Sequence, residues 1–186
     1  MTDNIRTSSS DEALVRERRD QFIKCAAKVF YEKGYPGATI RELAQACGMA
    51  QGTIYHYLGS KEDILHLICV SRSRGVKGLR ELLHDLGNVS CTEAVCRCME
   101  KHFQGADSVA QDNIFFNREI SNFSRDDRRV LLESQIDIRK FFEQLIIEGV
   151  QAGEFKVDSP ALVAHNIMMM GHDWGLRRWF SGTCLL

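Results

Sequence analysis

The chain has 186 residues, of which 44% are hydrophobic and 26% are charged, and its formal net charge is −1. These are ordinary values for a globular chain, long enough for one well-cored domain or for a small domain joined to a larger one. The polar first residues lack the apolar core of a signal peptide, and no apolar run is long enough to span a membrane, so we expect a cytoplasmic protein. The seven cysteines are an odd number at mostly apolar positions, which favours reduced thiols over a disulfide framework.

Charge is distributed unevenly along the chain. Residues 1–75 hold 11 Lys and Arg against 9 Asp and Glu, a net charge of +2, whereas residues 76–186 hold 13 against 16, a net charge of −3. The positive excess is too small to predict nucleic-acid binding alone, but its sign suits an N-terminal part that faces DNA.

A first helix is predicted over residues 11–33. Its apolar residues follow offsets of zero, three, four, seven and eight, which is one face of a helix. They are Phe22, Cys25, Ala26, Val29 and Phe30. Gly34 stops this helix, and Pro36 and Gly37 turn the chain towards the next one.

Two short helices follow, joined by a tight turn. Thr39 can cap the first of them, and Glu42, three residues later, completes a capping box. Gly48 suits the left-handed residue that ends this helix, and residues 51–58 form the second one. With Ile54 facing inward, the polar residues of the second helix point outward. Two short helices around a glycine-containing turn are a helix-turn-helix signature.

Helical periodicity continues to the end of the chain, and no strand has a convincing alternation. Gly75 and Gly78 are points where the longest predicted helix can loosen, and Ser159 with Pro160 can start the last one. The predicted helices cover residues 61–86, 91–103, 112–123, 126–149 and 159–180.

The stretch from about Arg18 to Leu67, about a quarter of the chain, resembles the DNA-binding domain of the tetracycline-repressor (TetR) family of bacterial transcription regulators. The matching residues are in register and without gaps: Ala26, Phe30, Gly34, Thr39, Ile40, Ile54, Tyr55, Tyr57, Lys61 and Leu65. We therefore expect an all-α protein of about nine helices. Residues 11–60 would form a three-helix helix-turn-helix DNA-binding domain, and residues 61–186 a helical ligand-binding and dimerisation domain.

A recognition helix must present donors and acceptors to base edges in the major groove. The outward residues of the second short helix suit that role: Gln51, Thr53, Tyr55, His56 and Tyr57. The resemblance implies that Thr39, Tyr57 and Lys61 contact DNA phosphates. Further affinity, independent of sequence, can come from Arg41 and from the cluster Arg16, Arg18 and Arg19. The alternative is that all these residues are the polar face of a small helical domain.

A single helix-turn-helix domain contacts too few bases for selective binding, so we expect a homodimer on a palindromic operator in double-stranded DNA. The resemblance places the dimer surface on the last two long helices. Gly171 and Gly175 lie four residues apart, so they let a partner helix approach closely or else pack within the monomer.

The resemblance also implies a pocket for a small-molecule effector in the C-terminal helices. The candidate lining residues are Phe115, Phe116, Phe142, His165, Met169, His172 and Trp174, with Arg118 and Arg139 as anion partners. Apolar residues at helical spacing are usually core, which is the alternative for each of them. The aromatic and methionine content favours a largely apolar effector. The segment FFNREISNFSRDDRR is similar to that of members that sense fatty acids or acyl-CoA thioesters.

These observations predict a ligand-responsive DNA-binding transcriptional regulator, a repressor that its effector releases from DNA. The alternative is a ligand-free, DNA-bound interaction protein, such as a division or nucleoid factor on the same fold. An open pocket of a few hundred cubic ångströms would favour the first.

Catalytic and metal chemistry find little support. No nucleophile motif, glycine-rich phosphate loop or metal motif accompanies His172 and Asp173, so we predict no enzyme, no cofactor and no metal. Cys91, Cys98 and His102 can share one helical face at offsets of zero, seven and eleven. Ordinary packing explains them, and a metal or redox site stays open although no zinc spacing appears.

Overall fold

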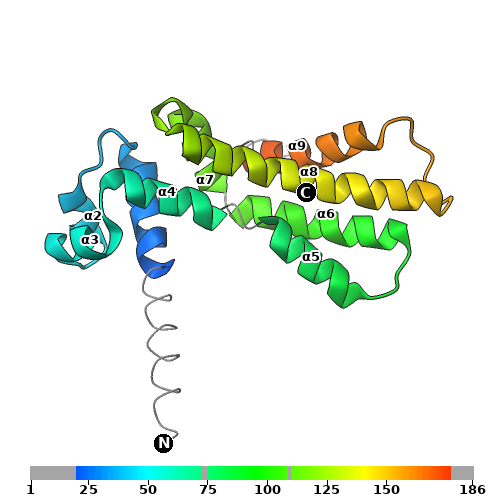
Figure 1. Cartoon of the computed structure of the whole chain (residues 1–186), viewed down its shortest axis with the longest axis horizontal. Helices are drawn as coiled ribbons and strands as arrows, with labels where there is room; N and C mark the ends of the chain where they lie inside the picture. Colours follow the sequence, from blue (N-terminus) through cyan, green and yellow to red (C-terminus); the bar gives the residue numbers. More distant parts are fainter. Residues whose placement is uncertain (1–19, 73–74, 109, 177–186) are drawn as a thin grey trace, which may run out of the picture. The chain divides into compact units, whose positions relative to one another are not determined.

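The computed structural model describes residues 20–72, 75–108 and 110–176, and within these ranges helices are joined only by turns and short loops (Figure 1). The all-helical prediction is confirmed for this part of the chain. The side chains of residues 56–58, 72, 107–108 and 174–176 are outside the description. Also outside it lie residues 11–19 of the first predicted helix, with Arg16, Arg18 and Arg19, and the predicted end of the last helix.

The chain divides into two compact units, and the division falls between Ile68 and Cys69. It lies inside α4 (Lys61–Arg72), so α4 contributes residues to both units. The predicted domain boundary between residues 60 and 61 stays a prediction, because a compact unit and a functional domain need not end at the same residue.

The first unit contains a helix over residues 20–33, then α2 (Ile40–Ala46), α3 (Gln51–Leu58) and the first part of α4. The predicted apolar stripe of the helix over residues 20–33 is confirmed, since all its members except the half-buried Cys25 are buried. The other helices of this unit also contribute apolar side chains to the buried interior. These fully buried side chains are Leu43, Ile54, Ile64 and Leu65.

Local sequence determines where these helices begin and end. The predicted capping box at Thr39 and Glu42 is present, and Gly48 has the expected left-handed conformation with φ of 64°. Ser60 caps α4 by accepting a hydrogen bond from the Asp63 amide at 3.1 Å, while its own amide donates to the Asp63 carboxylate. Short motifs therefore determine the start of α2, the turn that follows it and the start of α4.

The second unit contains the longer helices, which pack on one another around a shared apolar core. Its elements after α4 are α5 (Gly75–Leu86), α6 (Cys91–Ser108), α7 (Ala110–Glu119), the 3-10 turn η1 (Ile120–Asn122), α8 (Arg125–Gln151) and α9 (Pro160–Leu176). Contacts join α8 to α9, α6 to both of them, and α5 to α6 and α8. The core residues include Cys98, Phe142, Leu145, Ala164 and Ile167.

Within the predicted helix of residues 61–86, the structure has α4 over Lys61–Arg72 and α5 over Gly75–Leu86, and residues 73–74 between them lie outside the described ranges. None of the described helices combines the length and the apolar character that a bilayer crossing requires.

Candidate nucleic-acid interface and ligand cavity

Among the described side chains of α3, the predicted recognition helix, Ile54 is buried and the polar residues lie on or near the surface. Ile54 is completely buried, whereas Gln51 is exposed, Thr53 is half-buried and the Tyr55 side chain is 61% exposed. Three residues of the predicted reading set therefore lie on or near the surface. His56 and Tyr57 belong to α3, but their side chains are outside the described part of the structure.

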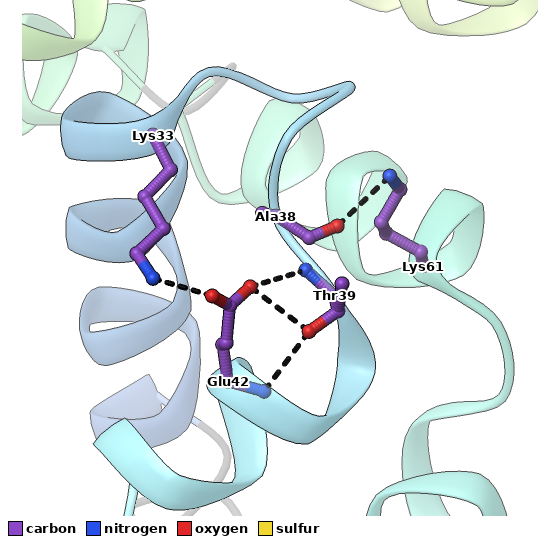
Figure 2. A network of polar contacts seen from close by, with 5 residues as sticks. All are labelled: Lys33, Ala38, Thr39, Glu42 and Lys61. Atoms are coloured by element: carbon purple, nitrogen blue, oxygen red, sulfur yellow. Dashed lines mark hydrogen bonds and ion pairs between the residues drawn. The ribbon is translucent and has the colours of Figure 1, made fainter.

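The start of α2 is organised around the carboxylate of Glu42 (Figure 2). Oε2 of this carboxylate accepts hydrogen bonds from the backbone amide and the hydroxyl of Thr39, each at 2.9 Å. Oε1 accepts from the Lys33 ammonium, which comes from the preceding helix. The Thr39 hydroxyl in turn accepts from the Glu42 amide at 3.3 Å.

These donors lower the pKa of Glu42 from its ordinary value of 4.5 to about 2. The hydrogen bond from Lys33 is the largest cause, followed by those from the side chain and backbone of Thr39. Glu42 is therefore ionised at neutral pH. The single hydroxyl hydrogen of Thr39 is donated to Glu42, so a hydrogen bond from this hydroxyl to a phosphate would replace its bond to the carboxylate.

Lys61, the first residue of α4, has its ammonium bound by the loop that precedes α2. Nζ donates to the carbonyl oxygens of Tyr35 at 2.9 Å, Ala38 at 3.0 Å and Pro36 at 3.4 Å. It also lies 4.6 Å from the centre of the Tyr35 ring, within the range of a cation–π interaction. Arg41, by contrast, is exposed on α2. The predicted phosphate contacts of Thr39, Tyr57, Lys61 and Arg41 stay predictions.

The second unit contains a cavity of about 660 Å³. Its lining residues come from α4 to α9 and from η1, and all of them belong to this unit. Much of the wall is apolar, from Leu79, Phe116, Ile120, Leu131, Leu132 and Ile138. Two cationic residues, Lys101 and Arg128, also line the cavity, and both are exposed to solvent.

Two histidines line the cavity from facing helices, His102 on α6 and His172 on α9. Burial lowers the pKa of both imidazoles, so both are neutral at pH 7. Nε2 of His102 is buried and has no hydrogen-bond partner among the described residues. The His102 ring lies against Gly171, where a Cβ atom would overlap it. Gly171 thus packs within the monomer, which is the second of the two alternatives given for it above.

The predicted effector-binding residues are only partly brought together. Phe116 and His172 line the cavity, whereas Phe115 and Phe142 are buried in the interior and do not line it. The two predicted anion partners face carboxylates instead. Arg118 donates to Glu119 at 2.9 Å, and Arg139 donates to Glu143 at 2.6 Å. His165 and Met169 are exposed on α9, and the Trp174 side chain is outside the description.

Sequence reasoning missed the cationic residues of the cavity. Arg128 lies within the arginine-rich run that opens α8, and Leu131, Leu132, Gln135 and Ile138 follow it at helical spacing. That periodicity could have identified the wall contributed by α8. No sequence pattern links it to Lys101, because the cavity joins elements that are distant in sequence. Cys91 and Cys98 lie away from the cavity, and no three metal-ligating side chains gather among the described residues.

With this geometry in place, comparisons with known proteins identify the family. The profile described as "Bacterial regulatory proteins, tetR family" matches residues 22–68. The profile "Tetracyclin repressor-like, C-terminal domain" matches residues 89–183, which is more than half of the chain. The chain belongs to the tetR family. It is a DNA-binding transcriptional regulator, as the resemblance implied, and the family's members are regulators rather than enzymes.

Relatives resemble this tetR-family chain over most of its length. The HTH-type transcriptional regulator HbdR of Aromatoleum sp. (strain CIB) is 26% identical over 95% of this chain and 77% of its own. The crystal structure of PfmR from Thermus thermophilus has a TM-score of 0.74 and 27% identity, covering 89% of this chain and 88% of its own. FadR from Bacillus subtilis, solved in complex with stearoyl-CoA, shares the fold, with a TM-score of 0.70 and 22% identity over 88% of each chain.

Members of the tetR family bind operator DNA, act as dimers and bind small-molecule effectors. The helix-turn-helix of the first unit and the cavity of the second unit match these two binding roles.

Proposed function

We propose that this chain is a cytoplasmic repressor that binds a palindromic operator as a homodimer and is released by a small amphipathic effector of the fatty-acid or acyl-CoA class. The observation that carries this proposal is the cavity of about 660 Å³ in the second unit. Cavities of this size are typical of small-molecule sites. A ligand that prefers one arrangement of the dimer changes operator affinity only by its differential affinity for the two states.

On the DNA side, α3 supplies the base-reading residues. Gln51, exposed at the start of α3, can form a bidentate pair with adenine, and the methyl group of Thr53 can contact a thymine methyl. The Tyr55 side chain is 61% exposed, and His56 and Tyr57 follow it. Thr39 and Arg41 flank the phosphate backbone from α2, with Arg41 supplying positive charge.

The helix α9 supports the dimer. It buries residues 164, 167, 168 and 171, and it exposes residues 162, 165, 166, 169, 170 and 173, which lie at offsets of zero, three, four, seven, eight and eleven. The exposed stripe includes Leu162 at 59%, Met169 at 46% and Met170 at 50% exposure. Three large apolar side chains on one outward face favour a partner surface.

The chemistry of the cavity favours an effector with an apolar body and an anionic group. Its apolar walls suit a hydrocarbon chain, and Lys101 and Arg128 suit a carboxylate or phosphate. His102 and His172 add polar side chains to the same lining. The stearoyl-CoA complex of FadR supports the same class. The alternative of a ligand-free interaction protein expects a filled interior, and the open cavity weighs against it.

Two neighbouring arginines of α8 allow a sharp test. Arg128 lines the cavity, whereas Arg129 is exposed and pairs with Asp126 and Glu133. The operator is first obtained by selection from random duplexes, and acyl-CoAs of increasing chain length are then titrated onto the complex. We expect long-chain acyl-CoA to release the protein from the duplex. Arg128→Met should weaken the binding of acyl-CoA about tenfold or more, since a hydrogen bond to a charged group contributes about 1.5–3 kcal/mol. Arg129→Met is the matched control and should behave as the wild type.

Native mass spectrometry of the purified protein, followed by extraction of any bound small molecule, tests the effector class without the choice of a candidate compound beforehand. Selection of a duplex together with failure of every fatty acid and acyl-CoA to bind would refute the effector class. Failure to prefer any duplex over random competitor would refute the repressor itself.

A further inference from the structure

Two cysteine thiols of the first unit lie in contact with each other. Cys25 belongs to the helix over residues 20–33, and Cys47 is the C-cap residue of α2. A hydrogen bond joins the two side chains. Both are free thiols and both are half-buried, so a small solute can reach the pair from solvent.

This contact is close to the geometry of a disulfide. A disulfide holds its sulfur atoms about 2.05 Å apart, and hydrogen-bonded thiols already face each other, so a short further approach would complete the bond. Because the bond would be accessible and would draw two packed elements together, it would be readily reduced again. Such a pair suits a reversible change better than a permanent crosslink.

The turn after α2 is the side of this pair that would move. Cys25 shares its helix face with Phe22 and Ala26, which are buried in the core. Cys47 instead begins the turn, and the next residue, Gly48, has a left-handed φ of 64°. The recognition helix α3 begins three residues after Gly48. A displacement of Cys47 is therefore passed to α3 through a very short segment.

The two thiols also differ in their readiness to react. Burial raises the pKa of the Cys47 thiol, and the hydrogen bond and charge of Cys25 raise it further. Cys47 is therefore protonated at neutral pH and is a poor nucleophile, since the thiolate is the reactive form. This assigns the first attack to Cys25. Once Cys25 has reacted, its charge no longer opposes ionisation of Cys47.

We propose that Cys25 and Cys47 form a redox-active dithiol, which a low-molecular-weight disulfide oxidises to a protein disulfide that weakens operator binding. The inference rests on the DNA-binding role of the first unit and adds a second input besides the effector cavity. The disulfide would shift the turn that leads into α3, and a recognition helix must fit the major groove closely to reach base edges.

The reaction is a thiol–disulfide exchange in two steps. The Cys25 thiolate attacks one sulfur of the small disulfide, forms a mixed disulfide and releases a small thiolate, which takes up the proton that Cys25 lost. The sulfur of Cys47 then attacks that of Cys25 and releases the second small thiol, which takes up the proton of Cys47. The protein loses two electrons and two protons, and the small disulfide gains them. Because the thiols are in contact, the second step is intramolecular and therefore fast.

The first experiment maps the bond in the wild-type protein. Full-length protein is equilibrated with mixtures of reduced and oxidised glutathione, alkylated with iodoacetamide and digested with trypsin without reduction. We expect a disulfide-linked pair of peptides, residues 25–28 and residues 42–61, which hold Cys25 and Cys47. Cys96, exposed on α6, is the internal comparison and should carry glutathione instead. Glutathione on Cys25 and Cys47 without the linked peptides, or no reaction of either, would overturn the inference.

The second experiment measures the binding of one selected duplex by reduced and oxidised protein. We expect oxidation to weaken binding about tenfold, comparable to the loss of one good base contact, and dithiothreitol to restore it. Cys25→Ser and Cys47→Ser should each bind equally well under both conditions, whereas the matched control Cys96→Ser should respond as the wild type does. The use of both single variants guards against one of them failing to fold.

Two results would contradict redox control of DNA binding. One is an unchanged affinity in protein that contains the linked peptides, and the other is an equal loss of affinity in the wild type and in Cys25→Ser. If the reduced wild type preferred no duplex, the proposed repressor function would fail instead, and peptide mapping would still report the dithiol by itself.

Discussion

The carboxylate of Glu42 is held by groups from two places in the sequence. Thr39 lies three residues before it and was predicted from the capping pattern, which the structure confirms. Lys33 lies nine residues before it, across a loop, and no local pattern links the two. The local half of this network could be predicted because helix capping has a fixed spacing. The other half depends on how the preceding helix packs.

The lowered pKa of Glu42 makes the stability of the first unit depend on pH. Its folded-state pKa of about 2 is below its ordinary value of 4.5, so protons bind the unfolded chain first as the pH falls. This contribution to stability is fully present above pH 4.5 and is lost as the pH falls towards 2. We expect the difference in unfolding free energy between wild type and Glu42→Gln, from urea denaturation, to be constant above pH 4.5 and to shrink below it.

Comparison with Glu42→Gln is necessary because neighbouring carboxyl groups titrate in the same range. The pKa of Glu62 is also lowered, by hydrogen bonds from its own backbone amide and from the Tyr35 hydroxyl, and the pKa of Asp63 is lowered by hydrogen bonds from the backbone and side chain of Ser60. Their effects are present in both proteins and cancel in the difference. If the difference in unfolding free energy stayed constant down to pH 3, the Glu42 carboxylate would lack its hydrogen bonds from Thr39 and Lys33 in solution.

At the site, the exposure of Gln51 and Tyr55 could be predicted from helical periodicity, because Ile54 had to face inward. The surroundings of Lys61 could not. A resemblance carries over the role of a residue but not its hydrogen-bond partners, and those partners lie 23 to 26 residues earlier in the chain.

At the scale of elements, helix starts with a capping motif were well predicted, because short motifs determine them. Two helix ends were predicted wrongly, since α6 continues to Ser108 beyond residue 103 and α7 ends at Glu119 before residue 123. Ser159 and Pro160 begin α9 as expected, with the Leu162 amide donating to the Ser159 hydroxyl at 3.3 Å. Gly153 follows α8 with φ of 74°. Sequence did not indicate that Phe155 then folds back onto α8, where its ring lies directly over Gly149.

Gly149→Ala should therefore destabilise the second unit, because the added methyl group would overlap the Phe155 ring. Overpacking of this kind costs about 1–3 kcal/mol. The matched control is Gly78→Ala in α5, where no atom lies near the new Cβ and replacing a helical glycine stabilises by up to about 1 kcal/mol. Chemical denaturation measures the unfolding free energy of each variant, which should fall for Gly149→Ala and rise for Gly78→Ala. A Gly149→Ala protein as stable as the wild type would contradict the packing of Phe155 on Gly149.

For the whole molecule, sequence could predict an all-helical chain but not the cavity. Its walls combine residues from α4 to α9, and the apolar ones have the same periodicity as core residues. Periodicity distinguishes inward from outward positions, and it does not distinguish a cavity wall from a packed interior. This is why Phe115 and Phe142 were candidates for the pocket and are core instead.

The proposed dimer depends on the outward stripe of α9. Burial of an exposed Leu or Met contributes about 1.5–3 kcal/mol, and the twofold symmetry of a dimer would use Leu162 and Met169 twice. Because these side chains are only 59% and 46% exposed, about half of that value applies to each, so the double variant Leu162→Lys, Met169→Lys should weaken dimerisation by about 3 kcal/mol or more, roughly 10²-fold in Kd. Sedimentation velocity at micromolar concentration should show a dimer for the wild type and a monomer of 21.2 kDa for the double variant, which would also lose operator binding.

The control for that dimer test is Ile114→Lys on α7, an apolar residue 40% exposed and outside the α9 stripe. It adds a charge at a comparable exposed position and should leave the dimer intact. Because operator affinity is measured on the same samples, the loss of DNA binding can be compared with the loss of the dimer as protein concentration rises. A double variant that remains dimeric would show that the α9 stripe is not the dimer surface. A monomer that still binds the palindrome with wild-type affinity would show that the dimer does not set the spacing of the two helix-turn-helix domains.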